Sequence, residues 1–256
     1  MSKPQEYIIH TEKEICGIRK ACIAAGLVRE KLSQLIVAGM TTEELNDLAR
    51  DLIAKTGGKS AFLGYRGYPG EICISLNDVV VHGIGTKFRT ITNGDIVSID
   101  VGVNLDGFIG DNATTVAVGD IPENVQMLMK KTEESLYVGI DMAVKGNRIR
   151  QISTAIERVA KKARLGVVKD FVGHGTGVEL HEPPEIPNFR NNNKGPILRP
   201  GMVLAIEPMF NLGTEKVFVD SDNWTCRTKD GQASAHYEHT ILITKNKPEI
   251  LTWQKK

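Results

Sequence analysis

The sequence predicts an α+β fold made of two similar halves. The first observation is a short phrase that occurs twice, at Gly94–Asp100 and Gly201–Glu207: a glycine, an apolar run of strand character, and a carboxylate six positions on. The second is that helical and strand-like segments precede each copy in the same order. We predict a duplicated α+β unit, folded about a pseudo-twofold axis around an antiparallel sheet, although two generic helix–strand units could also coincide. The expected domain is single, residues 1–256, with half-repeats of about 12–120 and 121–252.

Two helices followed by strands are predicted in the first half. The first helix covers about residues 11–37. The second begins at Thr41, because Thr41-x-x-Glu44 is a capping-box pattern, and Gly57 ends it. Strand-like runs follow at 71–76, 95–103 and 108–118.

The second half follows the same plan. A helix begins at Pro122 and runs to about residue 144. Another helix is expected to end near Gly166. It carries its apolar residues on one face, namely Ile149, Ile152, Ile156 and Val159. Strands are predicted at about 167–172, 202–210, 216–219 and 236–244, and the segment 188–200 is predicted to be one surface loop.

The two halves align at a constant offset of 107 residues. The matched positions are Gly39 with Gly146, Leu45 with Ile152, Leu52 with Val159, Gly94 with Gly201, and Asp100 with Glu207. In a fold of this kind, a shared sheet face would hold a site where the halves join.

Composition and charge are those of an ordinary globular chain. Of 256 residues, 41% are hydrophobic, and 32 Lys and Arg nearly balance 31 Asp and Glu, which gives no case for a nucleic-acid or membrane-surface partner. No apolar run approaches the length of a membrane span, and the N-terminus lacks the apolar stretch of a signal peptide. The four cysteines (Cys16, Cys22, Cys73 and Cys226) form no CxxC pair, so we expect reduced thiols in a cytoplasmic protein. The expected state is a monomer.

Two aspartates lie in a predicted hairpin. Asn104-Leu105-Asp106-Gly107 is a strong turn signal between two strand-like runs. With a loop at 105–106, Asp100 would lie directly opposite Asp111; with a loop at 106–107, the two would be diagonal neighbours. Either register puts like charges on one face, which a divalent cation would stabilise. Two solvated surface acids are the alternative.

Histidines and further carboxylates occur in strand-like or glycine-rich contexts. His174 lies in Gly173-His174-Gly175-Thr176-Gly177, which could cradle a phosphate or hold a structural imidazole, but no Lys-Ser/Thr pair follows it. His181 follows at His-x6-His spacing, unlike a helical HExxH zinc site. Glu207 precedes Pro208, Glu238 precedes an apolar run, and His82 ends one. Taken together, Asp100, Asp111, His174, Glu207 and Glu238 could hold two metal ions, since four carboxylates balance two dications.

These residues and their neighbours resemble the pita-bread metallopeptidases, and among them the type I methionine aminopeptidases. The match runs from about Tyr7 to Thr252. It rests on Cys73-Ile74-Ser75-Leu76-Asn77, Val81-His82-Gly83, Ile99-Asp100-Val101, Gly110-Asp111, Gly173-His174-Gly175, Ile206-Glu207-Pro208-Met209 and Tyr237-Glu238-His239-Thr240. The resemblance implies that Asp100, Asp111, His174, Glu207 and Glu238 bind two divalent ions (Co, Mn, Fe or Zn), with Asp111 and Glu238 bridging.

The resemblance also implies roles outside the ligand set. His82 would contact the substrate amide nitrogen, His181 would stabilise the oxyanion, and Glu207 would shuttle a proton. The methionine side-chain pocket would be formed by Tyr65, Tyr68, Cys73 and Trp224, with Phe62 and Leu180 at its edge. Phe62 and Arg66 depart from the Cys and His of some members, which affects the pocket rim. A monovalent-cation site is implied near Asn77, Val79 and Ser234.

The implied function is metal-dependent removal of the N-terminal methionine from nascent polypeptides with a small second residue, through a hydroxide that two metal ions activate. Its partners would be nascent N-termini, with ribosome contact left open. One rival is an X-Pro aminopeptidase or dipeptidase of the same fold, which usually carries a separate N-terminal domain. Another is a non-enzymatic pita-bread binding protein, which would have lost ligands that this chain keeps.

Overall fold

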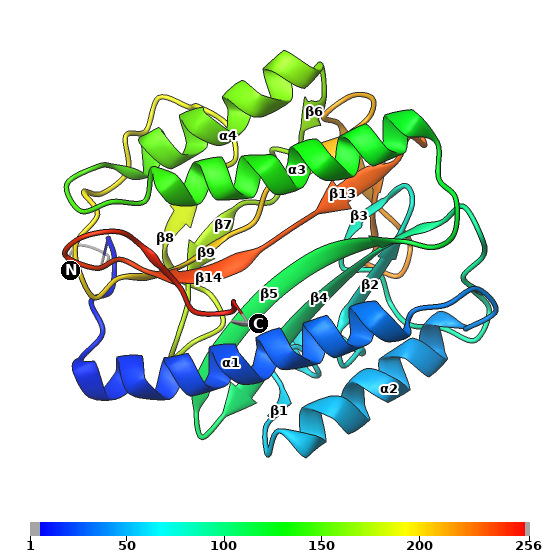
Figure 1. Cartoon of the computed structure of the whole chain (residues 1–256), viewed down its shortest axis with the longest axis horizontal. Helices are drawn as coiled ribbons and strands as arrows, with labels where there is room; N and C mark the ends of the chain where they lie inside the picture. The colour runs from blue at the N-terminus through cyan, green and yellow to red at the C-terminus, as the bar shows by residue number, and fades with distance from the viewer. Residues whose placement is uncertain (1–5, 254–256) are drawn as a thin grey trace.

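A computed structural model of the chain describes residues 6–253, so the first five and last three residues of the predicted domain lie outside the described part. Four helices flank the strands, with α1 and α2 below them and α3 and α4 above them in Figure 1. The helices are α1 (Glu12–Leu35), α2 (Thr42–Lys55), α3 (Glu123–Asp141) and α4 (Ile149–Ala163). No helix in residues 6–253 is long and apolar enough to cross a membrane.

The strands form four sheets, and every strand pairing within residues 6–253 is antiparallel. The first joins β1 (Lys59–Ser60), β4 (Ile96–Leu105), β2 (Cys73–Leu76) and β5 (Phe108–Ala117). The largest runs β15 (Glu249–Ile250), β14 (His239–Leu242), β9 (Val203–Ile206), β7 (Gly173–Gly175) and β8 (Glu182–Ile186). The other two contain β13 (Ser234–His236), β10 (Met209–Asn211) and β6 (Gly166–Val167), and β11 (Val217–Val219), β12 (Cys226–Thr228) and β3 (Val79–Val81).

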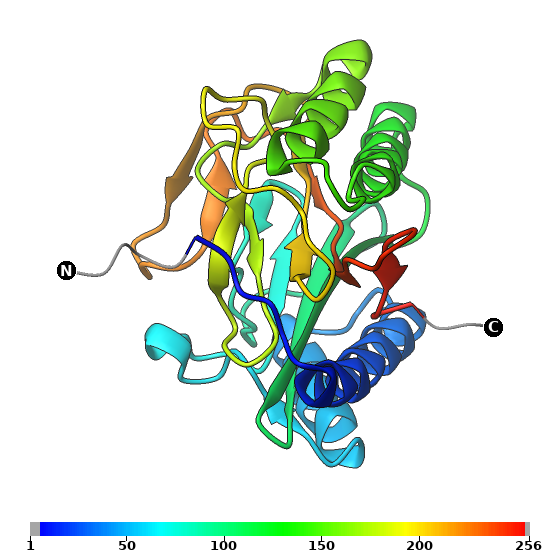
Figure 2. The same ribbon diagram turned by 90° about the vertical axis from the view of Figure 1, so that its left-hand side faces the viewer.

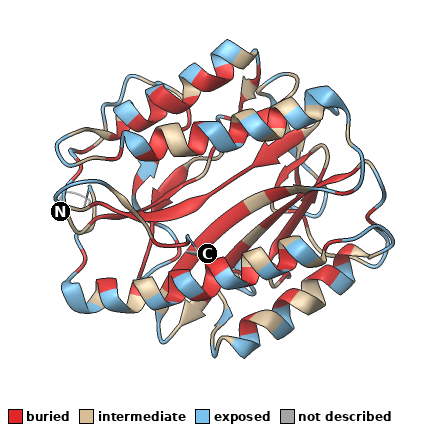
Figure 3. Ribbon diagram, viewed as in Figure 1, coloured by how far each residue is buried: buried red, intermediate tan, exposed pale blue. Residues whose placement is uncertain are grey.

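The predicted helices are confirmed, including the start of the second. Thr41 caps α2, with its side chain accepting from the backbone N–H of Glu44 while the Glu44 carboxylate accepts from the backbone N–H of Thr41. Each helix is exposed on its outer face and buried towards the strands (Figure 3). Each half builds its own core: α1 and α2 pack Leu32, Leu45 and Ile53 against Val97 and Ile99, whereas α3 and α4 pack Leu136, Ile152 and Ile156 against Leu204 and Ile206.

Backbone hydrogen bonds recur at the predicted offset. Gly39 N–H donates to the Ile91 carbonyl at 2.8 Å, and Gly146 N–H donates to the Leu198 carbonyl at 3.0 Å. The glycines that open the repeated phrase share one backbone geometry, with φ of 93° at Gly94 and 92° at Gly201, a left-handed value that favours glycine. Isolated bridges join Thr41 to Thr90 and Arg148 to Ile197. These matches support our proposal of half-repeats at about 12–120 and 121–252.

Three predicted strands are wrong in extent. The segment 167–172 is not one strand, because β6 ends at Val167 and β7 begins at Gly173. The predicted strands 202–210 and 236–244 each divide in two, since β9 ends before Glu207 and β13 ends before Tyr237. At the second break the backbone changes partner: Glu238 N–H donates to the Ala113 carbonyl of β5 at 3.0 Å. The breaks leave Glu207 and Glu238 between strands, where the two halves meet.

Candidate metal centre

The β4–β5 hairpin places two of the predicted ligands on one face. Asp100 pairs with Ala113 and Asp111 with Gly102, so the two aspartates are diagonal neighbours. Leu105 pairs with Phe108, which makes Asp106-Gly107 the loop. The structure therefore selects the second of the two predicted registers.

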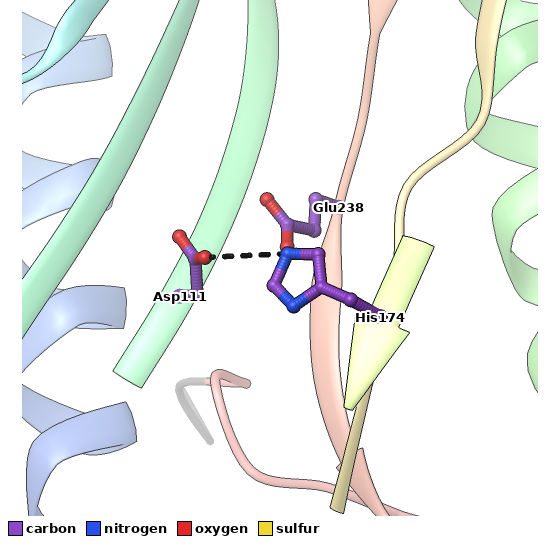
Figure 4. A group of neighbouring side chains, drawn as sticks. All are labelled: Asp111, His174 and Glu238. Atoms are coloured by element: carbon purple, nitrogen blue, oxygen red, sulfur yellow. Dashed lines mark ion pairs between the residues drawn. The ribbon is translucent and has the colours of Figure 1, made fainter. Parts of the chain in front are cut away.

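The second half supplies the remaining predicted ligands. His174 lies on β7, paired with Ala205 of β9, and Glu207 directly follows β9. Glu238 lies between β13 and β14 and is bonded through its backbone to β5. Figure 4 shows Asp111, His174 and Glu238 converging from these separate segments.

The distances bring these side chains into one cluster. Ligand atoms of Asp111, His174 and Glu238 all lie within 4.8 Å of one another. His174 Nε2 is 3.9 Å from Asp111 Oδ2 and 3.4 Å from Glu207 Oε1. Asp100 borders the same cluster, because, besides burial, charge repulsion between it and Asp111 raises its own pKa and its charge raises the pKa of Glu207. All five predicted ligands therefore line the same cavity.

Burial disfavours the charged form of every group in this cluster. The pKa of Asp111 rises to about 7, chiefly because the carboxyl is desolvated. Desolvation and the neighbouring carboxylates raise the pKa values of Asp100, Glu207 and Glu238 well above their usual range. Burial also lowers the pKa of His174 to about 3, which keeps the imidazole neutral, the form that binds metal.

The donor set fits a divalent ion. Asp100 Oδ1, Asp111 Oδ1 and Glu238 Oε1 are buried and have no hydrogen-bond partner among the described residues, a costly arrangement without a cation. Hydrogen bonds from outside orient the donors: His174 Nδ1 lies 2.9 Å from the Gly175 carbonyl, and Thr240 Oγ1 donates to the Asp111 carbonyl at 2.7 Å. An imidazole held through Nδ1 presents Nε2 to the carboxylates, as metal-binding histidines do.

A cavity of about 360 Å³ adjoins the cluster and contains every predicted substrate-binding residue. Its apolar wall is held in place by Tyr68, whose hydroxyl donates to the Gly83 carbonyl at 2.8 Å and whose ring meets Trp224 edge-on at 5.1 Å. The predicted residues that line it are Phe62, Tyr65, Tyr68, Cys73, His82, Leu180, His181 and Trp224, and Arg66 lies at the rim.

Two histidines face this cavity in the neutral form. Burial lowers the pKa of His82 to about 4, and its ring meets Phe171 edge-on at 5.1 Å. Burial and the nearby Arg66 lower the pKa of His181. His181 stacks on Tyr65, with Nδ1 2.8 Å from the phenolic oxygen, and its ring centroid is 4.2 Å from that of His174.

Sequence reasoning missed several residues of the site. His236 is buried, with Nε2 3.6 Å from Glu207 Oε2, yet no role was predicted for it. Asp170 and Phe171 line the cavity although they precede the glycine-rich segment. A usable signal for His236 was its place two residues before Glu238, on the same face of a β-strand.

The segments of the predicted monovalent-cation site also meet. Ser234 N–H donates to the Asn77 carbonyl at 2.8 Å, and the Asn77 side chain donates to Asp95 at 2.8 Å. Val79 lies on β3, paired with Arg227 of β12. Asn77 has φ of 53°, a conformation that directs its carbonyl towards the second half. A cation held by these three residues remains a proposal.

Comparisons with known proteins agree with this geometry. The model of metallopeptidase family M24 matches residues 16–245. The chain is 45% identical over 245 residues to the methionine aminopeptidase of Clostridium acetobutylicum and to methionine aminopeptidase 1 of Bacillus subtilis, covering 96% of this chain and 98% of each relative. The crystal structure of methionine aminopeptidase from Thermotoga maritima is similar with a TM-score of 0.94 at 42% identity, over 97% of this chain and all of that one.

A more distant likeness concerns the fold alone. Prolidase from Pyrococcus furiosus matches with a TM-score of 0.78 at 24% identity, over 97% of this chain and 66% of that one. The solved structures confirm the predicted pita-bread fold. The chain therefore belongs to metallopeptidase family M24 and, within it, to the methionine aminopeptidases.

Proposed function

We propose that this chain removes the N-terminal methionine from polypeptides whose second residue is small, with nascent chains as the source of substrate. One observation carries the proposal: a buried acidic cluster and a narrow apolar pocket open into the same cavity. The pocket suits an unbranched thioether, and the cluster suits metal-assisted hydrolysis. Membership in the methionine aminopeptidases supports the same conclusion.

We propose that Asp100, Asp111, His174, Glu207 and Glu238 hold two divalent ions, with Asp111 and Glu238 shared between them. Divalent ions bound there would supply Lewis-acid chemistry, polarising a carbonyl oxygen and lowering the pKa of water. Oxygen and nitrogen donors of this kind accept Mn, Fe, Co or Zn. Four carboxylates would balance two dications, which suits a site of such low exposure.

The residues that line the cavity would select the substrate by its free α-amino group and by the side chain of its first residue. The methionine side chain would fill the space between Tyr68, Cys73 and Trp224, which are mostly buried and apolar. The free α-amino group would then lie against the acidic cluster, which explains why a free N-terminus is required. Phe62 lines the same cavity, and its ring packs so closely on Gly102 that an added Cβ would lie 2.4 Å from it.

Three groups would handle protons and developing charge. Glu207 lies at the cluster, with Oε1 3.4 Å from His174 Nε2, where its carboxylate could take a proton from the attacking water and pass it to the leaving amine. His181 can accept a hydrogen bond from the Tyr65 hydroxyl at Nδ1, which leaves the proton on Nε2 to stabilise the oxyanion. Neutral His82 can accept a hydrogen bond from the substrate amide N–H.

Replacing His82 separates catalysis from metal binding. We expect His82→Ala to lower kcat/KM for Met-Ala-Ser about 100-fold, the scale of one positioned catalytic group, while metal content stays unchanged. His82 has φ of 59°, so His82→Asn is the companion variant, because Asn tolerates this backbone conformation but is too short to replace the imidazole. Loss of metal in both variants would contradict the role assigned to His82.

A tripeptide panel tests the function itself. With Mn or Co added to the chelated protein, Met-Ala-Ser should be hydrolysed about 10- to 100-fold faster than Leu-Ala-Ser, because the narrow pocket discriminates by shape. Ala-Pro-Ala is the matched control for an X-Pro peptidase and should remain intact. Preferential cleavage of Ala-Pro-Ala would favour the X-Pro alternative, and no turnover with any metal would favour a binding protein.

A further inference from the structure

A buried pair links the start of the chain to the active-site region. His10 Nε2 lies 3.0 Å from Glu182 Oε2, and each side chain is 2% exposed. His10 directly precedes Thr11, which caps α1, whereas Glu182 is the first residue of β8. The two are therefore brought together by the fold, and neither belongs to the metal cluster or lines the cavity.

The second oxygen of Glu182 holds the turn between β7 and β8. Glu182 Oε1 accepts the backbone N–H of Val178 at 2.8 Å and that of Glu179 at 2.9 Å. Burial raises the pKa of Glu182, but the contact with His10 and the hydrogen bonds from these two amides outweigh it and lower the pKa below its usual range. The carboxylate thus closes a turn whose last residues, Leu180 and His181, face the cavity.

His10 is itself fixed and lies directly against the turn. Its backbone N–H donates to the Gly201 carbonyl at 2.9 Å. Gly177 approaches the ring so closely that an added Cβ would lie 3.1 Å from His10 Cε1 and Nε2. From the other side, Ile109 of β5 donates to the Gly177 carbonyl at 2.7 Å. Figure 2 shows the N-terminal segment passing in front of the strands of the second half before it enters α1.

The turn decides where the His181 ring sits. His181 is the residue immediately before Glu182, and its ring must reach both Tyr65 and the space beside His174. Leu180 packs with Phe62 and Tyr68 in the pocket wall. Without the Glu182 carboxylate to hold its backbone amides, the turn would move and would shift the Leu180 and His181 side chains together.

We propose that His10 and Glu182 are positioning residues, which fix the 176–182 turn and so aim His181 at the reacting carbonyl. The proposal rests on the function proposed above, because it assigns His181 a part in turnover. His10 acts through Glu182, whose Oε2 lies 3.0 Å from His10 Nε2, and Glu182 acts through the amides of Val178 and Glu179.

Three variants test this chain of contacts. His10→Ala should lower kcat for Met-Ala-Ser about 10- to 100-fold, the scale of a 1 Å misplacement, with metal content unchanged. His10→Gln should recover most of that loss, because its side-chain amide can still donate to Glu182 Oε2. Arg19→Gln is the matched control: Arg19 lies on α1 and pairs with Glu249 of β15, away from the turn, so its kcat should stay at the wild-type value.

A double-mutant cycle asks whether His10 acts through His181. In a His181→Ala background, adding His10→Ala should change kcat less than about twofold, because the group that it positions is gone. If the double variant loses kcat by the product of the two single-variant losses, the proposal is overturned. A His181→Ala variant that retains full turnover would also overturn it.

Amide exchange supplies a readout that does not depend on turnover. In His10→Ala, the amides of Val178 and Glu179 should exchange at least about tenfold faster, whereas Arg19→Gln should leave them unchanged. Unchanged exchange in His10→Ala would overturn the positioning role even with an active enzyme. If the wild-type protein fails to cleave Met-Ala-Ser while exchange is faster in His10→Ala, the result would count against the proposed function. The role of His10 and Glu182 in holding the 176–182 turn would still be supported.

Discussion

Asp111→Asn is expected to lose bound metal and turnover together. Asp111 is 3% exposed, its Oδ1 has no partner among the described residues, and its other oxygen faces His174. The amide removes the charge and turns one acceptor into a donor aimed at neighbouring acceptors. Loss of residues that merely orient ligands costs 10- to 100-fold in metal affinity, so loss of a bridging ligand should cost at least about 100-fold. Elemental analysis after gel filtration, together with Met-Ala-Ser kinetics, measures both losses.

Asp95→Asn is the matched control for this substitution. Asp95 is also buried, at 7% exposed, but it accepts hydrogen bonds from Asn77 and Thr92 outside the cavity. The same chemical change there should lower the free energy of unfolding by about 1–3 kcal/mol and leave metal content unchanged. Full metal occupancy in Asp111→Asn would falsify the assignment of Asp111 as a bridging ligand.

The hairpin shows how far sequence reasoning could reach. Alternation and the Asn-Leu-Asp-Gly signal placed Asp100 and Asp111 on one face, but they allowed two registers. The structure decides through local chemistry: Asn104 Oδ1 accepts the Gly107 N–H at 3.1 Å, which closes the loop at Asp106-Gly107. Both registers keep the same side chains on each face, so the pattern of apolar residues could not choose between them.

Strand breaks were beyond sequence reasoning because they depend on distant partners. The apolar run around Glu238 reads as one strand, yet its backbone leaves β10 and pairs with Ala113 of β5. Periodicity reports that a face is buried and does not report which chain segment buries it. The contact of His236 with Glu207 also joins distant segments, so the sequence offered a signal for His236 in its spacing to Glu238 and none in its spacing to Glu207.

The internal repeat predicted the frame of the site better than its chemistry. Asp100 and Glu207 occupy matched positions, each at the end of a repeated phrase. At the same offset Asp111 corresponds to Phe218, which is 45% exposed on β11, and His174 has no counterpart among the repeat landmarks. Symmetry thus accounts for one carboxylate from each half, and the residues that break it make the two halves of the cluster unequal.

Removing metal is expected to make the stability of the folded protein fall as pH rises from 7 to 8. Asp100, Glu207 and Glu238 have pKa values raised well above their usual range by burial and mutual repulsion, and that of Asp111 is raised to about 7. A carboxyl group whose pKa is raised in the folded state keeps its proton at pH values at which the same group in the unfolded chain has already lost it. Stability is therefore lost as pH rises from the unfolded towards the folded pKa of each such carboxyl group, and for Asp111, at about 7, this loss is still under way above pH 7.

The chosen window isolates these carboxylates from the histidines. The pKa values of His82 and His174 are lowered to about 4 and about 3, so their contribution is fully present above the unfolded value of 6.5 and is lost only at lower pH. Urea unfolding of the chelated protein at pH 7 and pH 8 measures the slope. Glu207→Gln should make the dependence of the unfolding free energy on pH shallower, because it removes one titrating carboxyl group. Glu215→Gln should not change it, because the pKa of that exposed carboxylate is lowered.

Divalent metal should reverse this dependence. A cation bound among Asp111, His174 and Glu238 competes with protons for the same oxygens, so its affinity rises with pH and the folded state gains more from it at pH 8 than at pH 7. Repulsion among the ionised carboxylates therefore destabilises the folded metal-free protein, and the same negative charges stabilise the metal-bound protein by binding the cation. Metal-free stability that holds constant or rises from pH 7 to 8 would contradict that account, because carboxylates so buried and so close cannot all ionise without cost.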